Sequence, residues 1–231
     1  MQTMFKEKFY FDVVDSTNSV AVSCPMYSVV CAEKQKAGRG RLGRKWISER
    51  GNLLMSVVLP VDEKMTFYGL MAGVAVAKAL KKYHPCVKWP NDVLIDGKKV
   101  CGILSEKQDD KLILGIGINI RSVPKSKEVL YPITALCEYD AFADKEDVMH
   151  TVLIFLEKEI NAFEKEGVEY LRKEWLSFAP AVGQKMEVRT PTETITGVFE
   201  TISSKGELVL KTENKQRYIS VGDAFFKEDR K

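Results

Sequence analysis

A glycine- and arginine-rich segment has the strongest chemical character in this sequence. Gly38-Arg39-Gly40-Arg41-Leu42-Gly43-Arg44-Lys45-Trp46 carries four cationic side chains within seven residues. Its glycines allow the backbone to approach a ligand closely, but they raise the entropic cost of ordering the segment. A ligand with several negative charges would offset that cost through charge-assisted hydrogen bonds. The segment therefore predicts an exposed loop that binds anions, and phosphate fits it best.

The residues of this loop argue against two known phosphate-binding motifs. Gly38 to Gly43 formally match the dinucleotide fingerprint G-x-G-x-x-G, but that motif needs a helix to begin at its last glycine and none is indicated. The spacing also resembles a Walker loop, yet Arg44 stands where the lysine must be. A solvated or nucleic-acid-binding basic loop stays as the alternative, although a formal net charge of +3 does not predict a basic face.

A second group of polar residues follows a short apolar run, in Lys88-Trp89-Pro90-Asn91-Asp92. Pro90 cannot continue a strand ladder, so Asn91 and Asp92 should be held where a strand turns. Asp92 could hold Mg²⁺ or orient a nucleophilic amine, and Lys88 could contact a phosphate. The alternative is that Asn and Asp are simply turn formers.

Further along, small residues interrupt two apolar strands. Lys99 precedes the first, in which Gly102 leaves room for a ligand, and Gly115 and Gly117 open a slot on the second, with packing bulges as the alternative. Neither of the two histidines belongs to a recognisable nucleophile motif. Direct transfer between bound substrates, driven by positioning and charge neutralisation, is therefore the expected chemistry.

These residues must be positioned by a sheet covered by helices. Apolar positions with helical spacing predict helices over 66–83, 145–163 and 168–178. Alternating or continuous apolar runs predict strands, and Asp96-Gly97 predicts a hairpin turn. After Pro180 the pattern changes to short strands, which predict a small all-β module, expected to be a barrel. The strands are expected at 9–14, 27–32, 52–59, 86–89, 93–95, 100–106 and 111–118, then at 185–189, 195–203, 208–211 and 217–221.

Composition narrows the class of protein. The 231 residues, 45% hydrophobic and 29% charged, suit a globular chain with one sizeable core and a small appended domain. Five cysteines without a Cys-x-x-Cys pair argue against a disulfide framework or a zinc site and favour a reducing compartment. Neither a signal peptide nor a membrane span is recognisable, so a cytoplasmic protein without a membrane partner is expected.

Taken in order, five segments resemble the catalytic core of biotin protein ligases, over roughly residues 9 to 120. The resemblance implies an α+β fold: a class II synthetase-like catalytic domain with a mixed sheet flanked by helices over 1–180, and an SH3-like β-barrel over 181–231. The segments are Asp15-Ser16-Thr17-Asn18, Gln35-Lys36-Ala37-Gly38-Arg39-Gly40-Arg41, Lys88-Trp89-Pro90-Asn91-Asp92, Lys99-Val100-Cys101-Gly102-Ile103-Leu104 and Gly117-Ile118-Asn119.

The resemblance also implies a reaction and a set of roles. Biotin and MgATP would give biotinyl-5′-adenylate and pyrophosphate, and a lysine of a biotin carboxyl carrier protein would then take the biotinyl group. The catalytic residues would be Arg39, Arg41, Lys99 and Asp92, with Asp92 beside the incoming lysine. Biotin would contact Ser16, Thr17, Asn18, Gln35, Gly38, Arg39, Gly40, Arg41, Lys99, Gly102 and Gly117; ATP would contact Arg41, Arg44, Trp46, Lys88, Asn91 and Asn119; and Asn91 with Asp92 would be the candidate Mg²⁺ ligands.

The expected partners follow from the same resemblance. Some members of the family carry an N-terminal helix-turn-helix domain and act as repressors, but Ser16 comes too early to leave room for one, so operator DNA is not expected. Exposed strand edges make a homodimer possible. A lipoate ligase of related architecture is the nearest alternative, and a nucleic-acid-binding module is the alternative from a different class.

Overall fold

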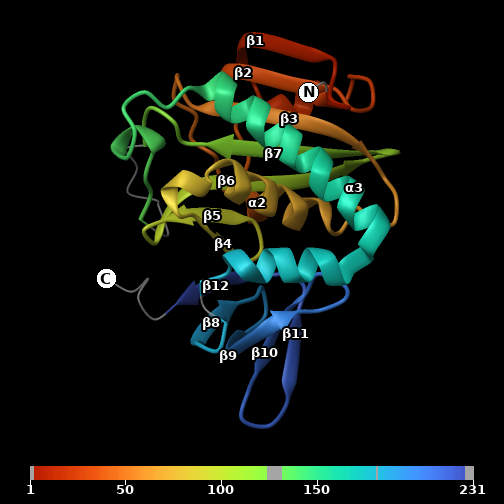
Figure 1. Ribbon diagram of the computed structural model, residues 1–231, viewed down its shortest axis with the longest axis vertical. Helices are drawn as coiled ribbons and strands as arrows, with labels where there is room; N and C mark the ends of the chain where they lie inside the picture. Colours follow the sequence, from red (N-terminus) through yellow and green to blue (C-terminus); the bar gives the residue numbers. More distant parts are fainter. Residues whose placement is uncertain (1–2, 124–131, 181, 227–231) are drawn as a thin grey trace.

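The computed structural model describes residues 3–123, 132–180 and 182–226, and its centre is a mixed seven-stranded sheet. The strand order is β1-β2-β3-β7-β6-β5-β4, with β1 parallel to β2 and the other neighbours antiparallel (Figure 1). The mixed sheet predicted from the sequence is therefore confirmed. Its strands are β1 (Lys8–Val14), β2 (Val29–Gln35), β3 (Leu53–Pro60), β4 (Cys86–Lys88), β5 (Asp92–Ile95), β6 (Lys98–Gln108) and β7 (Lys111–Ile118).

The middle of the sheet is apolar on both faces. Residues 53–59 of β3 are all buried, which explains why this strand is apolar at every one of these positions except Ser56 rather than alternating. The β5–β6 turn uses Asp96 and Gly97, whose φ angles are 50° and 72°. Two successive positive φ values define the tight hairpin turn that Asp-Gly sequences favour. The predicted hairpin is thus confirmed.

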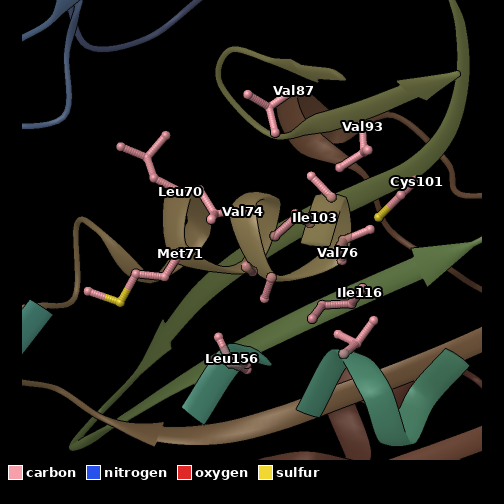
Figure 2. Close-up of a cluster of buried hydrophobic side chains, with 14 of the residues drawn as sticks. Leu70, Met71, Val74, Val76, Val87, Val93, Cys101, Ile103, Ile116 and Leu156 are labelled. Atoms are coloured by element: carbon pink, nitrogen blue, oxygen red, sulfur yellow. The ribbon is translucent and has the colours of Figure 1, made fainter. Parts of the chain in front are cut away.

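Two helices cover one face of the sheet and a short one covers the other. Helix α2 (Tyr68–Ala79) lies directly on the strands, and Figure 2 shows Val74 and Val76 of α2 beside Ile103 and Ile116. A 3₁₀ turn, η2 (Lys81–Tyr83), follows α2, and a second, η3 (Leu136–Glu138), precedes α3. The short α1 (Thr17–Ala21) packs on the opposite face, against β2, β3 and β7.

Helix α3 (Lys145–Phe178) runs across α2 and then turns under the main sheet (Figure 1). Asp144 caps its first turn, since its carboxylate accepts hydrogen bonds from the backbone N–H groups of Glu146 and Asp147, at 2.8 and 3.1 Å. Gly167 breaks the helix with φ 75° and ψ −164°. The sequence predicted separate helices over 145–163 and 168–178, and this glycine is the break between them.

The C-terminal residues form a second, antiparallel sheet. Its order is β11-β10-β9-β8-β12, so β12 pairs with β8 and, within the described residues, does not meet β11. The closed barrel expected from the sequence is therefore not formed by these strands, because closure requires the two edge strands to pair. Strand β12 was also not predicted. The bounds are β8 (Lys185–Arg189), β9 (Thr194–Ile202), β10 (Leu208–Lys211), β11 (Gln216–Ile219) and β12 (Asp223–Phe226).

The two sheets share one hydrophobic core. A single cluster of buried side chains extends from β3 and α2 through the end of α3 to Val188 and Phe199. Trp175 of α3 meets Phe199 edge-on, with 6.3 Å between ring centroids. The expected domain boundary lies at residue 181, outside the described residues. No helix in the described part of the chain is long and apolar enough to cross a membrane.

Candidate active site

One cavity of about 640 Å³ gathers the predicted site residues. The loop at residues 36–50, the ends of β4 and β5, the glycines of β6 and β7, and the start of β12 form its walls. Gly38 is the one predicted site residue that does not line it. The predicted residues that do are Ser16, Thr17, Asn18, Gln35, Arg39, Gly40, Arg41, Arg44, Trp46, Lys88, Asn91, Asp92, Lys99, Gly102, Gly117 and Asn119.

The glycine-arginine loop folds back on itself as a narrow hairpin. The Gly40 N–H donates to the Arg44 carbonyl at 2.7 Å, and the Trp46 N–H donates to the Gly38 carbonyl at 2.9 Å. A 3₁₀ turn, η1 (Arg41–Gly43), closes the hairpin, and Arg44 continues in extended backbone. No helix begins at Gly43, which excludes the dinucleotide fingerprint.

Gly38 does not line the cavity, but its lack of a side chain allows the loop to fold into its hairpin. A Cβ at this position would lie 2.4 Å from the Trp46 carbonyl oxygen, closer than atoms can approach. Glycine is therefore required for the two arms of the hairpin to meet.

The indole of Trp46 lies in the space left by two strand glycines. A Cβ at Gly102 would be 2.7 Å from the ring, and a Cβ at Gly117 would be 2.6 Å from it. The Lys99 ammonium is 5.7 Å from the indole centroid, within the range of a cation–π contact. The space that Gly102 and Gly117 leave beside the sheet is thus filled by the loop itself, which packs onto β6 and β7 through the Trp46 indole.

A chain of hydrogen bonds forms the polar wall near α1. The Gln35 amide oxygen accepts from the Thr17 backbone N–H at 2.8 Å and from its hydroxyl at 3.1 Å. Ser56 of β3 lies within 2.7 Å of the Thr17 hydroxyl and 2.6 Å of the Asn18 amide oxygen. Asn18 fills the space above Gly115, where a Cβ would be 2.5 Å from its Oδ1. Ser56 was not predicted, because a single serine in an apolar strand has no local signature.

Arg39 is held by a carboxylate that the sequence did not indicate. Its Nε and Nη2 donate to the two oxygens of Glu106, at 3.0 and 2.8 Å, and the Asn18 amide donates to the same carboxylate at 2.7 Å. Burial raises the pKa of Glu106, but the hydrogen bonds from Arg39 and Asn18 outweigh it and leave the pKa below its usual value. Glu106 therefore fixes an arginine of the loop against β6.

Lys99 and Asp92 form the charged pair at the centre of the cavity. The ammonium lies 2.5 Å from the Asp92 carboxylate, which is 8% exposed. Burying a carboxylate is unfavourable unless a cation or donor compensates it, and Lys99 provides this compensation. Asn91 is held separately, because its amide donates to the Ile103 carbonyl at 2.7 Å.

Two loop arginines reach the C-terminal sheet. Arg44 pairs with Asp223 of β12 at 2.8 Å. Arg41 donates to the Gly222 carbonyl at 3.1 Å and to the Asn91 amide oxygen at 3.4 Å. Asp223 was missed because it belongs to a strand that the sequence did not predict and is 179 residues away from its partner.

The remaining predicted phosphate contacts are buried side chains. Lys88 is 3% exposed, with its ammonium 5.7 Å from the Phe225 ring centroid. Asn119 is 2% exposed, and its amide donates to the Thr134 carbonyl at 3.1 Å. A buried lysine that lines a cavity adds a positive potential there with little screening by water.

The fit of a metal ion to the predicted ligands is limited in this arrangement. Asp92 is paired with Lys99, and the Asn91 amide oxygen accepts from Arg41. No group of three or more His, Cys, Asp or Glu side chains suited to a metal occurs in the described residues. Mg²⁺ is commonly bound through one or two carboxylates together with substrate phosphates. The described residues therefore form no protein cage for Mg²⁺, which would enter the cavity as part of the MgATP substrate.

A mixed sheet with a helix-covered face, a Gly-Arg loop over a cationic cavity and an appended β-sheet defines a class of ligase that activates carboxylic acids. Comparison with known proteins supports this class. Residues 10–122 match the model of the biotin/lipoate A/B protein ligase family, and residues 182–227 match the biotin protein ligase C-terminal domain.

Relatives extend the match to nearly the whole chain. The Bacillus subtilis bifunctional ligase/repressor BirA is 33% identical over 96% of this chain and 74% of its own length. The Paracoccus denitrificans biotin--[acetyl-CoA-carboxylase] ligase is 30% identical over 92% of this chain and 97% of its own length. The structure of the Aquifex aeolicus biotin protein ligase in complex with biotin and ATP superposes with a TM-score of 0.86 at 30% identity. The match covers 96% of this chain and 98% of that one. The chain belongs to the biotin protein ligases of this family.

Proposed function

We propose that this enzyme joins biotin to ATP, forming biotinyl-5′-adenylate and pyrophosphate, and then transfers the biotinyl group to a lysine of a biotin carboxyl carrier protein. One observation carries the proposal. The Gly-Arg loop, the Lys99–Asp92 pair and the Thr17–Gln35 network all line a single cavity in a chain that matches biotin protein ligases over nearly its full length.

In the first step the biotin carboxylate oxygen attacks the α-phosphorus of ATP, and the bond to pyrophosphate breaks. Both reacting groups are anionic, so their approach must be screened by cations. Arg39, Arg41 and Lys99 are the candidates, because all three line the cavity. Lys99 and Arg41 are held at fixed points, by Asp92 and by the Gly222 carbonyl. Fixed cations need no reorganisation as charge develops on the phosphoryl oxygens.

The polar wall near α1 suits the ring system of biotin. A ureido group has one carbonyl acceptor and two N–H donors, which call for both kinds of partner. Thr17, Asn18 and Gln35 supply hydroxyl and amide groups, and Ser16 lines the same wall. We assign these residues, with Gly40, to biotin. Gly38 supports the loop from behind, so a direct contact between Gly38 and biotin stays a prediction.

The nucleotide is assigned to the opposite wall. Arg41, Arg44, Lys88, Asn91 and Asn119 line it together with Trp46. The Trp46 indole packs on Gly102 and Gly117. When a nucleotide binds, this ring can replace its contact with the strands by a contact with the ligand.

In the second step the carrier lysine must lose a proton before its nitrogen attacks the biotinyl carbonyl carbon and AMP leaves. Asp92 is the carboxylate of this cavity nearest to Lys99, and we propose that it orients the incoming amine or accepts its proton. The arrangement favours this role over metal binding, which would require Asp92 to leave Lys99.

We further propose that residues 1–180 form the catalytic domain and 181–231 a smaller unit that completes the cavity. Asp223 and Ala224 line the cavity from β12. A cytoplasmic location is proposed because all five cysteines are free thiols, as expected in a reducing compartment.

A mass-spectrometric assay tests the function. The enzyme is incubated with biotin, MgATP and a purified biotin carboxyl carrier domain, and we expect the mass of one biotinyl group on the carrier only when biotin and ATP are both present. Dependence on lipoate in place of biotin would identify a lipoate ligase instead. Nucleic-acid affinity that falls with log salt and ignores biotin, without carrier modification, would favour the binding-module alternative.

A further inference from the structure

Ser56 is the one polar side chain in the buried run of β3 at residues 53–59. It is 0% exposed and does not itself line the cavity. Burying a hydroxyl group is unfavourable unless the group is hydrogen-bonded. Ser56 lies within hydrogen-bond distance of Thr17 and Asn18, which do line the cavity, so it contacts the polar wall near α1 from behind.

Gly115 gives Asn18 access to Ser56. Ser56 and Gly115 are directly opposite each other on β3 and β7, which lie side by side in the sheet (Figure 1). A Cβ at Gly115 would lie 2.5 Å from the Asn18 Oδ1, so a larger residue would push this amide away. With glycine there, the Asn18 Oδ1 lies 2.6 Å from the Ser56 hydroxyl.

Both amide groups of the wall have a fixed orientation. The Asn18 amide nitrogen donates to Glu106 at 2.7 Å, and the lowered pKa of Glu106 keeps that carboxylate ionised at neutral pH, so it can only accept. The Gln35 amide oxygen accepts from the Thr17 backbone N–H at 2.8 Å, and an N–H can only donate. The amide oxygens that meet the two hydroxyl groups are therefore acceptors only.

The hydroxyl groups of Thr17 and Ser56 have two protons for three short contacts. These contacts are Ser56 to Asn18 at 2.6 Å, Ser56 to Thr17 at 2.7 Å and Thr17 to Gln35 at 3.1 Å. Each hydroxyl donates one proton at a time. If Thr17 donates to Gln35, one of the two Ser56 contacts joins oxygens with no proton between them. If Thr17 donates to Ser56 and Ser56 to Asn18, both of the shortest contacts have a donor, and the Gln35 oxygen keeps a vacant lone pair.

We propose that Ser56 is a positioning residue that reserves the Gln35 amide oxygen for an N–H group of the ligand, an inference that rests on the proposed function. When the ligand binds, Thr17 turns its proton to Ser56, Ser56 donates to Asn18, and Gln35 accepts from the ligand. Every acceptor then has a donor. A site built to hydrogen-bond an N–H rejects analogues that lack it. The ureido ring of biotin has two N–H groups and the dithiolane ring of lipoate has none, so Ser56 favours biotin.

Removal of the Ser56 hydroxyl should close this acceptor. In Ser56→Ala the Thr17 proton has Gln35 as its remaining partner among the described residues. The Gln35 oxygen then accepts from two donors of the protein, and the ligand N–H loses its place. The substitution also leaves the Asn18 oxygen without its hydroxyl donor, which lowers the stability of the fold whatever the ligand.

Titration calorimetry on the full chain tests the proposal with biotin and two analogues, in each of which CH₂ replaces one ureido N–H. We expect the wild type to bind one analogue at least about tenfold more weakly than biotin. Ser56→Ala should lose a similar factor for biotin and should bind biotin and that analogue equally. Ser56→Thr keeps the hydroxyl and should restore the preference. Ser28→Ala is the matched control, because Ser28 is also 0% exposed and donates to the Pro25 carbonyl, outside the cavity.

Pyrophosphate exchange separates positioning from a purely structural role. The KM for biotin should rise in Ser56→Ala, while the KM for ATP and kcat stay close to those of the wild type. Equal losses for biotin and ATP, with the preference for biotin over the analogue unchanged, would overturn the proposal. Thermal unfolding of each variant shows whether the fold is intact.

The wild type alone also decides the matter. If it binds both analogues as tightly as biotin, no N–H is recognised and the proposal is wrong, whether or not Ser56→Ala folds. If it does not bind biotin at all, the proposed function fails and this inference fails with it. The two failures are therefore distinguishable.

Discussion

The carboxylate of Asp92 and the ammonium of Lys99 lie 2.5 Å apart, on the neighbouring strands β5 and β6. Asp92 and Lys99 belong to two different sequence motifs. They meet because the β5–β6 hairpin brings their strands side by side. The pair connects a cation suited to the first chemical step with a carboxylate suited to the second.

Asp92→Asn should therefore separate the two half-reactions. The amide keeps the shape but cannot accept the proton of the carrier lysine, so transfer should fall by about 10²–10⁴ while adenylate formation falls less. Pyrophosphate exchange measures the first step, and carrier mass measures the second. Asp96→Asn, in the exposed turn of the same hairpin, is the matched control. Equal losses in both assays would contradict the assignment of Asp92.

Gly117→Ala should weaken ATP binding by displacing Trp46. The added Cβ would lie 2.6 Å from the indole, and overpacking of this kind costs about 1–3 kcal/mol. Titration calorimetry with ATP should show at least a several-fold loss, and Trp46→Ala in the same chain should make the glycine substitution nearly silent. Gly69→Ala is the control, since its Cβ would be an ordinary 3.6 Å from Ser105. Additive losses in the double variant would show that the two residues do not act together.

Asp223→Asn should loosen the closure of the loop over its product. Arg44 loses its ion pair and Arg41 a nearby carboxylate at 3.8 Å. We expect faster escape of biotinyl-5′-adenylate, by a few-fold because both partners are partly exposed. Rapid-quench measurement of adenylate in solution against enzyme-bound adenylate checks this. Glu193→Gln, which removes an exposed carboxylate paired with Arg217 in the same sheet, should have no effect.

Glu106→Gln should free Arg39 and expose the loop to trypsin. The same substitution should also change how the stability of the fold depends on pH, and the sign of that change follows from the lowered pKa of Glu106. A carboxyl group with a folded-state pKa below 4.5 stabilises the fold above pH 4.5, and that stabilisation is lost as the pH falls through the folded-state pKa. Urea denaturation across this acid range should show a loss of stability in the wild type that is smaller in the variant. The same dependence of the free energy of unfolding on pH in both proteins would exclude this role for Glu106.

Lys78→Met should destabilise the fold more than any surface ion-pair substitution. Lys78 pairs with Glu159 at 2.7 Å and with Glu174 at 2.6 Å, and Glu159 is 1% exposed. Leaving a buried carboxylate without its cation costs about 3–5 kcal/mol. Lys82→Met, which removes a lysine with a 64% exposed side chain, should cost about 0–1 kcal/mol. Chemical denaturation of both variants compares them, and similar values would refute the distinction.

The sequence predicted elements well where the pattern is local. Helix α2, the β5–β6 hairpin at Asp96-Gly97 and the break at Gly167 depend on periodicity, turn chemistry and backbone freedom within a few residues. The described strands of the C-terminal sheet do not close into a barrel, and β12 was missed. Whether edge strands meet is decided by long-range pairing that four-residue patterns do not encode.

The sequence by itself determined the family, the sheet-and-helix class and most of the residues that line the cavity, because those residues lie in motifs whose chemistry is local. Only the tertiary structure decided their partners. It placed Glu106 against Arg39, Asp223 against Arg44 and the Trp46 indole on Gly102 and Gly117. These contacts join residues 67, 179, 56 and 71 positions apart, respectively. Such pairings depend on strand order and register, which are set by packing of the whole core and not by any single segment.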